Sequence, residues 1–241
     1  MDQAKLWESI EFIMFNAERK KNAESEVPDI INLLKISKNE KILDLCCGVG
    51  RHTLRFGRLG YNVTGVDITK QFLDKIKKNA AIECLNIALV HSDMTKFKKE
   101  NEFDVIYNLW DSFGMNSIED DFKCLQNVFE SLKSGGRFIM EISTTEITAK
   151  RFVSRKWYEE NGMYILKDRV PDEDLRGLLL RWIVIKDNKK YEFEKYVYQY
   201  TAYELTDSLK KVGFKNINLF ENFKGDKYNY NSNNLVLVAY K

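Results

Sequence analysis

The sequence is poor in proline, histidine and cysteine, with two, two and four of each. The cysteines, at positions 46, 47, 84 and 124, show no Cys-x-x-Cys spacing and do not pair with the histidines. We therefore expect reduced thiols and no metal site. No apolar run approaches the length of a membrane span, and the first residues lack a signal-peptide pattern. These absences predict a soluble, cytoplasmic protein without a membrane partner.

The chain also carries little excess charge of either sign. Its 38 basic and 36 acidic residues give a formal net charge of +2. Phosphate backbones are usually bound by a strong basic excess, so this balance argues against nucleic acid as the main partner. Hydrophobic residues make up 44% of the 241 positions, which is enough for a sizeable core. The length fits a single domain over residues 1–241 that carries an insertion.

Strand and helix patterns alternate through the first 142 residues. Apolar runs predict five strands, at about 41–45, 62–66, 87–90, 103–107 and 138–142. Helical periodicity separates them at 51–59, 70–82 and 118–133, and helices also fill residues 1–36, where Pro28 predicts a break between two of them. The alternation predicts a mostly parallel α/β sheet. Because the run 87–90 is continuously apolar, we expect that strand to be buried on both faces.

The pattern changes in a β insert at about residues 145–200. Charged residues alternate with β-branched and aromatic ones at 163–170, 176–186 and 190–199, which predicts antiparallel strands with one open face. Trp157 and Tyr158 precede these strands in a stretch that we expect to be irregular. A helix at 202–212 and strands at 214–221 and 234–240 follow. The predicted fold is a doubly wound, mostly parallel seven-stranded sheet with a small antiparallel insert.

A glycine turn follows the first strand. Gly48 and Gly50 let the backbone approach a ligand closely. Asp67 ends the second strand, where a carboxylate can accept hydrogen bonds from a ribose diol. Taken alone, Asp67 and Asp93 also fit the caps of the helices that follow them. At the carboxyl ends of neighbouring strands, however, they lie where an open α/β sheet binds its ligand.

These landmarks together resemble the class I S-adenosylmethionine-dependent methyltransferases. The resemblance rests on the run 44–50 (Asp-Leu-Cys-Cys-Gly-Val-Gly), Asp67, the pair 93–94 (Asp-Met) and the glycines at 135–136. Their order and spacing cover residues 40–142, and the closing helix and strands match as well. The antiparallel insert resembles that of small-molecule methyltransferases, including amino-sugar and glycine-type N-methyltransferases.

A nicotinamide-dependent oxidoreductase is the main alternative. Its fingerprint also has an acidic residue after the second strand, but it needs a third glycine three residues after the second one. Thr53 occupies that position here. Asp44 within the first strand and Asp93 after the third are expected of a methyltransferase and have no role in such a dehydrogenase. The residues therefore favour S-adenosyl-L-methionine over NAD.

The resemblance implies how the cofactor would be held. The backbone of Cys46–Gly50 would contact its methionine part, and Asp67 would bind the ribose hydroxyls. Ile68 would pack against the adenine, whose amino group would donate to Asp93, with Met94 beside the ring. Cys46 stands where the family most often has glycine or alanine, but cysteine is still small.

Other contacts are implied at the methyl group and over the cofactor. Asn108 and Leu109 would lie near the sulfonium. Phe15 and Arg19, on the N-terminal helices, would cover the site and pair with the cofactor carboxylate. His52 and His91, without a third ligand, are expected to be structural.

The acceptor side is less defined by the residues. Trp110 and Asp111 follow the fourth strand, where the acceptor usually sits in such enzymes, although a packed indole and a turn carboxylate would give the same pattern. Trp157 and Tyr158 are hypothesised to cap the acceptor pocket. Asp111 is the candidate general base, and the fallback candidates are Tyr107 and His91.

The predicted function is methyl transfer from S-adenosyl-L-methionine to nitrogen or oxygen of a small-molecule acceptor. The alternatives are an NAD-dependent oxidoreductase and an RNA-directed methyltransferase. We expect a monomer or a homodimer. The acceptor itself is not defined by the sequence.

Overall fold

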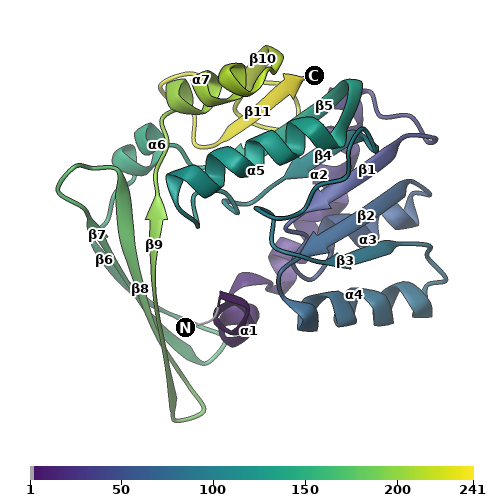
Figure 1. The fold of residues 1–241 in the computed structure, drawn as a ribbon. Helices are drawn as coiled ribbons and strands as arrows, with labels where there is room; N and C mark the ends of the chain where they lie inside the picture. The colour runs from purple at the N-terminus through teal and green to yellow at the C-terminus, as the bar shows by residue number, and fades with distance from the viewer. Residues whose placement is uncertain (1–2) are drawn as a thin grey trace.

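A computed structural model describes residues 3–241 of the chain (Figure 1). The helices are α1 (Gln3–Met14), α2 (Ala17–Leu34), α3 (Arg51–Arg58), α4 (Lys70–Ile82), α5 (Ile118–Ser131), α6 (Thr145–Lys150) and α7 (Ala202–Val212). The strands are β1 (Lys41–Leu45), β2 (Asn62–Asp67), β3 (Ala88–His91), β4 (Phe103–Asn108), β5 (Leu132–Ile142), β6 (Arg155–Glu160), β7 (Met163–Pro171), β8 (Gly177–Lys186), β9 (Lys189–Tyr198), β10 (Lys215–Phe220) and β11 (Leu235–Tyr240). No helix of the described chain is both long enough and apolar enough to cross a membrane.

Seven strands form the main sheet, in the order β10-β11-β5-β4-β1-β2-β3. Neighbours from β5 to β3 run parallel, whereas β11 pairs antiparallel with both β5 and β10. The predicted fold class, a mostly parallel seven-stranded sheet closed by an antiparallel hairpin, is confirmed. The carboxyl ends of β1, β2, β3 and β4 meet at one edge, because parallel neighbours share a direction.

Alternate residues of the central strands enter two different cores. Leu43, Ile106 and Phe138 face α5 and α7, whereas Ile42, Val105 and Ile139 face α2 and α3. All six of these side chains are almost completely buried. The period of two along each strand and the helices on both sides together produce a three-layer arrangement. This rigid body carries the loops that end β1, β2 and β4.

The second sheet consists of β6–β9 in sequential antiparallel order and stands apart from the main sheet, with α1 between them (Figure 1). Ile10 and Ile13 of α1 pack against Ile165, Val184 and Phe193 of this sheet. We call the face that carries these three residues the inner face and the opposite one the outer face. Together with α6, the four strands fall within the range predicted for the insert.

Pro28 does not break a helix, contrary to the sequence prediction. It lies inside α2, which runs unbroken from Ala17 to Leu34. A proline removes one N–H from the helix ladder, and the burial of Val27 and Ile30 beside it supplies the compensating packing. The actual break precedes α2, where the side chain of Asn16 accepts a hydrogen bond from the backbone N–H of Arg19 at 3.0 Å and caps the helix.

Two strand predictions were also wrong in part. The apolar run at 87–90 forms β3, but this strand lies at the edge of the sheet and Ala88 is exposed rather than buried on both faces. An edge strand has a neighbour on one side only, and periodicity alone cannot show this. Trp157 and Tyr158 belong to the regular strand β6, paired with β7, and not to an irregular stretch.

Candidate active site

A cavity of about 620 Å³ opens at the carboxyl ends of β1, β2 and β4. Its floor is formed by the loops after these strands, and its walls by the α1–α2 corner and the inner face of the second sheet. This volume is typical of small-molecule sites, roughly 300–1,000 Å³. We call it the first cavity. The predicted site residues that line it are Phe15, Arg19, Asp44, Cys46, Gly48, Asp67, Ile68, Asp93, Met94, Leu109, Trp110 and Asp111.

The turn after β1 is left-handed at three residues. The φ angles are 69° at Cys46, 55° at Gly48 and 80° at Gly50. Glycine adopts these angles freely, whereas for cysteine they cost roughly 1–2 kcal/mol. The amides of Cys46 and Cys47 both donate to the carbonyl of Val66 at 2.9 Å, which holds the turn against β2. Glycine would be favoured at position 46 by its backbone conformation, and Cys46 bears the cost of a left-handed φ.

The two glycines of this turn have different neighbours. A Cβ atom on Gly50 would lie 2.6 Å from Ile76 of α4, and Gly50 does not line the first cavity. A Cβ atom on Gly48 would lie 2.8 Å from the ring of Phe15, which covers the turn. Gly50 is therefore required for packing against α4, whereas Gly48 lets the ring of Phe15 pack directly onto the cavity floor.

Asp67 links the end of β2 to the glycine turn. One of its carboxylate oxygens accepts from the backbone N–H of Gly48 and the other from that of Thr69, both at 2.8 Å. Only 8% of the residue is exposed, and burial raises the pKa of Asp67 despite these hydrogen bonds. Thr69, not Asp67, occupies the N-cap position of α4. Each oxygen keeps a further lone pair, so the carboxylate can still accept from a ligand.

Asp44 is held in place by the residue that replaces the third glycine. The hydroxyl of Thr53 donates to the carboxylate of Asp44, and both side chains are buried. Burial raises the pKa of Asp44. A glycine at position 53 would have no donor for this carboxylate. Thr53, which stands where the dinucleotide fingerprint has its third glycine, therefore has a structural role at the cavity floor.

Asp93 and Met94 lie beyond β3. One oxygen of Asp93 accepts from the backbone N–H and the hydroxyl of Thr95, at 2.8 and 2.9 Å. Within the described chain the other oxygen makes no hydrogen bond. The sulfur of Met94 lies 3.4 Å from that of Cys46. Asp93 thus shapes its own turn and also keeps an acceptor for a ligand in the cavity that it lines.

Two guanidinium groups lie against Trp110. The central carbons of Arg19 and Arg51 are 4.3 and 4.2 Å from the centroid of the indole ring. Arg19 also donates to the carbonyls at the end of α1, at 2.8 Å for Met14, and so closes the α1–α2 corner. One terminal nitrogen of Arg51 donates to the carbonyl of Arg19 at 3.0 Å, while the other is buried and lacks a partner in the described chain.

Trp110 and Asp111 follow β4 with left-handed φ angles of 69° and 53°. Non-glycine residues in this region are strained, and such strain is often found at functional sites. The carboxylate of Asp111 accepts from the backbone N–H and the hydroxyl of Ser143. Asp111 therefore lies at the cavity wall in a fixed orientation, and Trp110 lines the same cavity while it packs against two arginines.

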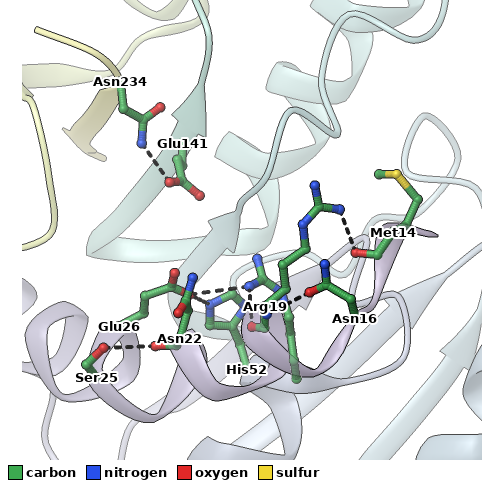
Figure 2. Close-up of polar contacts among 10 residues, drawn as sticks. Met14, Asn16, Arg19, Asn22, Ser25, Glu26, His52, Glu141 and Asn234 are labelled. Atoms are coloured by element: carbon green, nitrogen blue, oxygen red, sulfur yellow. Dashed lines mark hydrogen bonds and ion pairs between the residues drawn. The ribbon is translucent and has the colours of Figure 1, made fainter. Parts of the chain in front are cut away.

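A polar cluster that the sequence did not reveal contains His52 and Glu26 (Figure 2). His52 contacts Glu26 at 2.7 Å, and Arg51 lies 3.6 Å from the same carboxylate. Burial raises the pKa of Glu26, but the contact with His52 and the nearby Arg51 outweigh it and lower the pKa overall. Asn234 donates to Glu141 at 2.6 Å, and burial together with the carboxylate of Glu26 raises the pKa of Glu141 to about 7.

Other predicted residues lie outside the first cavity. Asn108 is buried behind it and donates to a carbonyl of β1 at 3.0 Å. Trp157 is 69% exposed, and Tyr158 lies on the inner face without lining the cavity. Neither fallback base is placed to act there, because Tyr107 is fully buried and His91 is exposed and contacts a backbone carbonyl.

The insert, expected as a lid, an acceptor wall or a dimer surface, contributes cavity-lining residues that the sequence did not single out. Lys167, Arg169, Trp182 and Lys195 line the first cavity from the inner face, and Arg151 lines it from the end of α6. The alternation in β7–β9 was visible in the sequence, but it could not show which set of alternating side chains faces the main sheet. The packing of α1 against Ile165, Val184 and Phe193 shows which set of side chains faces the main sheet.

Comparison with known proteins agrees with this geometry. Residues 42–136 match the family model described as a methyltransferase domain. A demethylmenaquinone methyltransferase of Staphylococcus epidermidis is 30% identical over 129 residues, which are 51% of this chain and 51% of that protein. The chain thus spans about half the length of this curated relative. A glycine/sarcosine N-methyltransferase of Aphanothece halophytica is 27% identical over 210 residues, 83% of this chain and 76% of the relative.

A solved structure extends the likeness to the whole fold. The S-adenosylmethionine-dependent methyltransferase from Clostridium acetobutylicum superposes with a TM-score of 0.79 at 18% identity, over 98% of this chain and 96% of that one. The sheet order, the antiparallel hairpin and the cavity at the strand ends define a Rossmann-like methyltransferase fold. Residues 42–136 are thus similar to a methyltransferase domain, and the chain shares the fold of S-adenosylmethionine-dependent methyltransferases, as its sequence predicted.

Proposed function

We propose that this protein transfers a methyl group from S-adenosyl-L-methionine to a nitrogen or oxygen of a small-molecule acceptor in the first cavity. The observation that carries the proposal is the convergence of Gly48, Asp67 and Asp93 on that cavity, at the carboxyl ends of neighbouring parallel strands. Ligands of open α/β sheets bind at this edge. The antiparallel β11 beside β5 distinguishes the sheet from an all-parallel dinucleotide-binding sheet, which supports the methyltransferase over the oxidoreductase.

The residues present fit this cofactor. Asp67 has acceptor capacity left for a ribose diol after it has bound the two backbone amides. Asp93 keeps one oxygen for the adenine amino group, with Met94 and Ile68 lining the same part of the cavity. The backbone at Gly48, which lines the cavity, would contact the methionine part.

Phe15 and Arg19 would cover the bound cofactor. Phe15 reaches over the glycine turn and packs edge-on against Phe72, with ring centroids 5.4 Å apart. Arg19 holds the α1–α2 corner beside Trp110. Leu109 lies on the wall nearest β4, whereas Asn108 would act only by orienting the end of β1.

When bound, the cofactor supplies a methyl group already activated by the sulfonium, so the chain needs chiefly to align the acceptor. Holding two reactants in an attack geometry can contribute roughly 7–11 kcal/mol. Trp110 and its two arginines form a rigid wall for this purpose. Asp111, oriented by Ser143, is the proposed group that receives the acceptor's proton.

We further propose that residues 1–241 act as one methyltransferase domain with the second sheet as the wall of the acceptor site. The free thiols of the described chain support a reducing, cytoplasmic location. A monomer or a homodimer remains our proposal for the assembly, with no nucleic acid as partner.

Thermal unfolding in the presence of S-adenosylmethionine, S-adenosylhomocysteine and NADH tests the cofactor. We expect the first two ligands to raise the Tm and NADH to leave it unchanged. A panel of amines, sugars and phenols in an assay for released S-adenosylhomocysteine then tests methyl transfer. Stabilisation by NADH alone, or cofactor binding without transfer to any member of a broad panel, would contradict the proposal.

A further inference from the structure

A second cavity of about 450 Å³ opens beside the first and shares part of its wall. Asp111, Arg151, Lys167 and Arg169 line both cavities. Lys156 lines only the second one. A molecule in the first cavity can therefore extend past Asp111 into the second without crossing a layer of packed side chains.

The charged lining of the second cavity is strongly unbalanced. Four cations line it, and Asp111 is the single carboxylate among the described lining residues. Asp111 is hydrogen-bonded to Ser143 and makes no ion pair within the described chain. The charges of Arg151 and Arg169 act on it, but one carboxylate cannot balance four cations. Lys156 and Lys167 face each other directly across β6 and β7, which places like charges side by side.

The outer face of the same sheet provides a comparison within the molecule. There Arg155 pairs with Asp168 at 2.6 Å, and Glu192 pairs with Lys190 at 2.6 Å and with Arg181 at 3.7 Å. On the inner face, none of the cations of the second cavity has an ion pair within the described chain. The strands therefore neutralise the cations that face solvent and leave unpaired those that face the cavity.

Like charges this close repel one another, and burial also costs Lys167 part of its hydration. Burial, together with the nearby guanidinium groups of Arg19 and Arg169, lowers the pKa of Lys167 to about 8. Lys167 finds only aromatic partners, with its ammonium 3.8 Å from the centroid of Trp182. An anion with several oxygens would relieve this repulsion and would match the fork of an arginine.

We propose that the second cavity binds an anionic group of the methyl acceptor, a phosphate or a carboxylate, through Arg151 and Arg169. This inference rests on the proposed function, since it assigns the second cavity to the substrate of the first. The acceptor would place its nucleophilic nitrogen or oxygen at Trp110 and Asp111 and its anionic end between α6 and β7. Specificity for charged acceptors over neutral ones of equal size follows from this arrangement.

Calorimetric titration of the 241-residue protein, saturated with S-adenosylhomocysteine, tests the site. The two probes are inorganic pyrophosphate and citrate, each at low and at moderate salt. We expect at least one probe to bind, with an affinity that falls as salt rises. A stronger response to pyrophosphate would identify a phosphoryl acceptor, and a stronger response to citrate a carboxylate one.

The variants Arg151→Gln and Arg169→Gln lie on different elements and should each weaken probe binding by about tenfold or more, the loss of one charged hydrogen-bonded contact. Arg181→Gln, on the outer face of the same sheet, is the matched control and should change binding by less than about twofold. A retained Tm increase with S-adenosylhomocysteine shows that each variant is folded. If one variant fails to fold, the other still decides the question.

The two proposals fail in different ways. No binding of either probe to the wild type, or an equal loss in Arg181→Gln, would overturn the anionic subsite while leaving cofactor binding intact. Absence of any Tm increase with S-adenosylhomocysteine in the wild type would instead contradict the proposed function. Arginine-dependent probe binding without cofactor binding would keep an anion site but remove its assignment to a methyl acceptor.

Discussion

Replacement of Glu141 by glutamine should stabilise the protein at neutral and alkaline pH and leave it nearly unchanged in acid. One oxygen of Glu141 accepts from Asn234 at 2.6 Å, and the other is buried without a partner in the described chain. Burial, with the nearby carboxylates of Glu26 and Asp111, raises the pKa of Glu141 from 4.5 to about 7. A glutamine keeps the carbonyl acceptor for Asn234 and removes the charge.

The sign of the pH dependence of stability follows from the direction in which the pKa of Glu141 is shifted. A carboxyl with a folded-state pKa above its unfolded value binds its proton more tightly in the folded protein. The contribution of this protonated carboxyl to the free energy of unfolding is complete below about pH 4.5. It is lost as the pH rises through about 7, where the folded-state carboxyl ionises. One pKa unit corresponds to about 1.36 kcal/mol. The free energy of unfolding of the wild type should therefore fall by about 2–3 kcal/mol relative to Glu141→Gln across this window.

Urea denaturation at pH 4.5 and at pH 8 measures this difference, with the m-value as a check that the unfolding transition is unchanged. Glu194→Gln, at an exposed position on the outer face of the second sheet, is the control and should follow the wild type at both pH values. A stability gain in Glu141→Gln that is equal at both pH values, or larger in acid, would refute the reasoning.

Three further substitutions test other parts of the site. Asp67→Ala should weaken S-adenosylhomocysteine binding by about 1–3 kcal/mol because it removes a charged acceptor; an unchanged Kd in calorimetry would contradict the ribose-binding role. Gly60→Ala should lower the free energy of unfolding by roughly 1–2 kcal/mol, and Gly50→Ala should lower it by more. Both glycines have a positive φ, but only at Gly60 is there open space for a Cβ atom, so equal losses in urea would be evidence against the packing role. Thr53→Val should destabilise the protein by about 1–3 kcal/mol by leaving the carboxylate of Asp44 without its donor, and Thr53→Ser should restore most of the loss.

The features that the sequence predicted correctly are set by neighbouring residues. Alternating apolar runs and helical periods located the strands of the main sheet, and a turn that needs left-handed residues can be recognised from glycine and small side chains. Asp67 and Asp93 could be placed in one cavity because parallel strands end at the same edge. These inferences need no knowledge of distant packing.

The wrong predictions concern features that depend on packing. Pro28 is tolerated because the faces of α2 around it are buried against the sheet. The strand at 88–91 is apolar although it lies at an edge, and Trp157 lies in a strand because β7 pairs with it. Glu141 and Asn234 meet across β5 and β11, which are far apart in the chain, and no local pattern indicates that contact.

The acceptor side shows most clearly what alternation can and cannot reveal. In β7, Lys167, Asp168 and Arg169 are consecutive in the sequence, and a reader of the sequence sees a mixed charged run on a solvated strand. In the fold, Asp168 points outward to Arg155, whereas Lys167 and Arg169 point inward to a cavity in which Asp111 is the single carboxylate among the described lining residues. A sheet that only shielded the cofactor would gain stability from an inward aspartate or an apolar pair at these positions. Lys167 and Arg169 have no ion pair within the described chain, and a bound ligand with negative charge would best explain why cations occupy these inward positions.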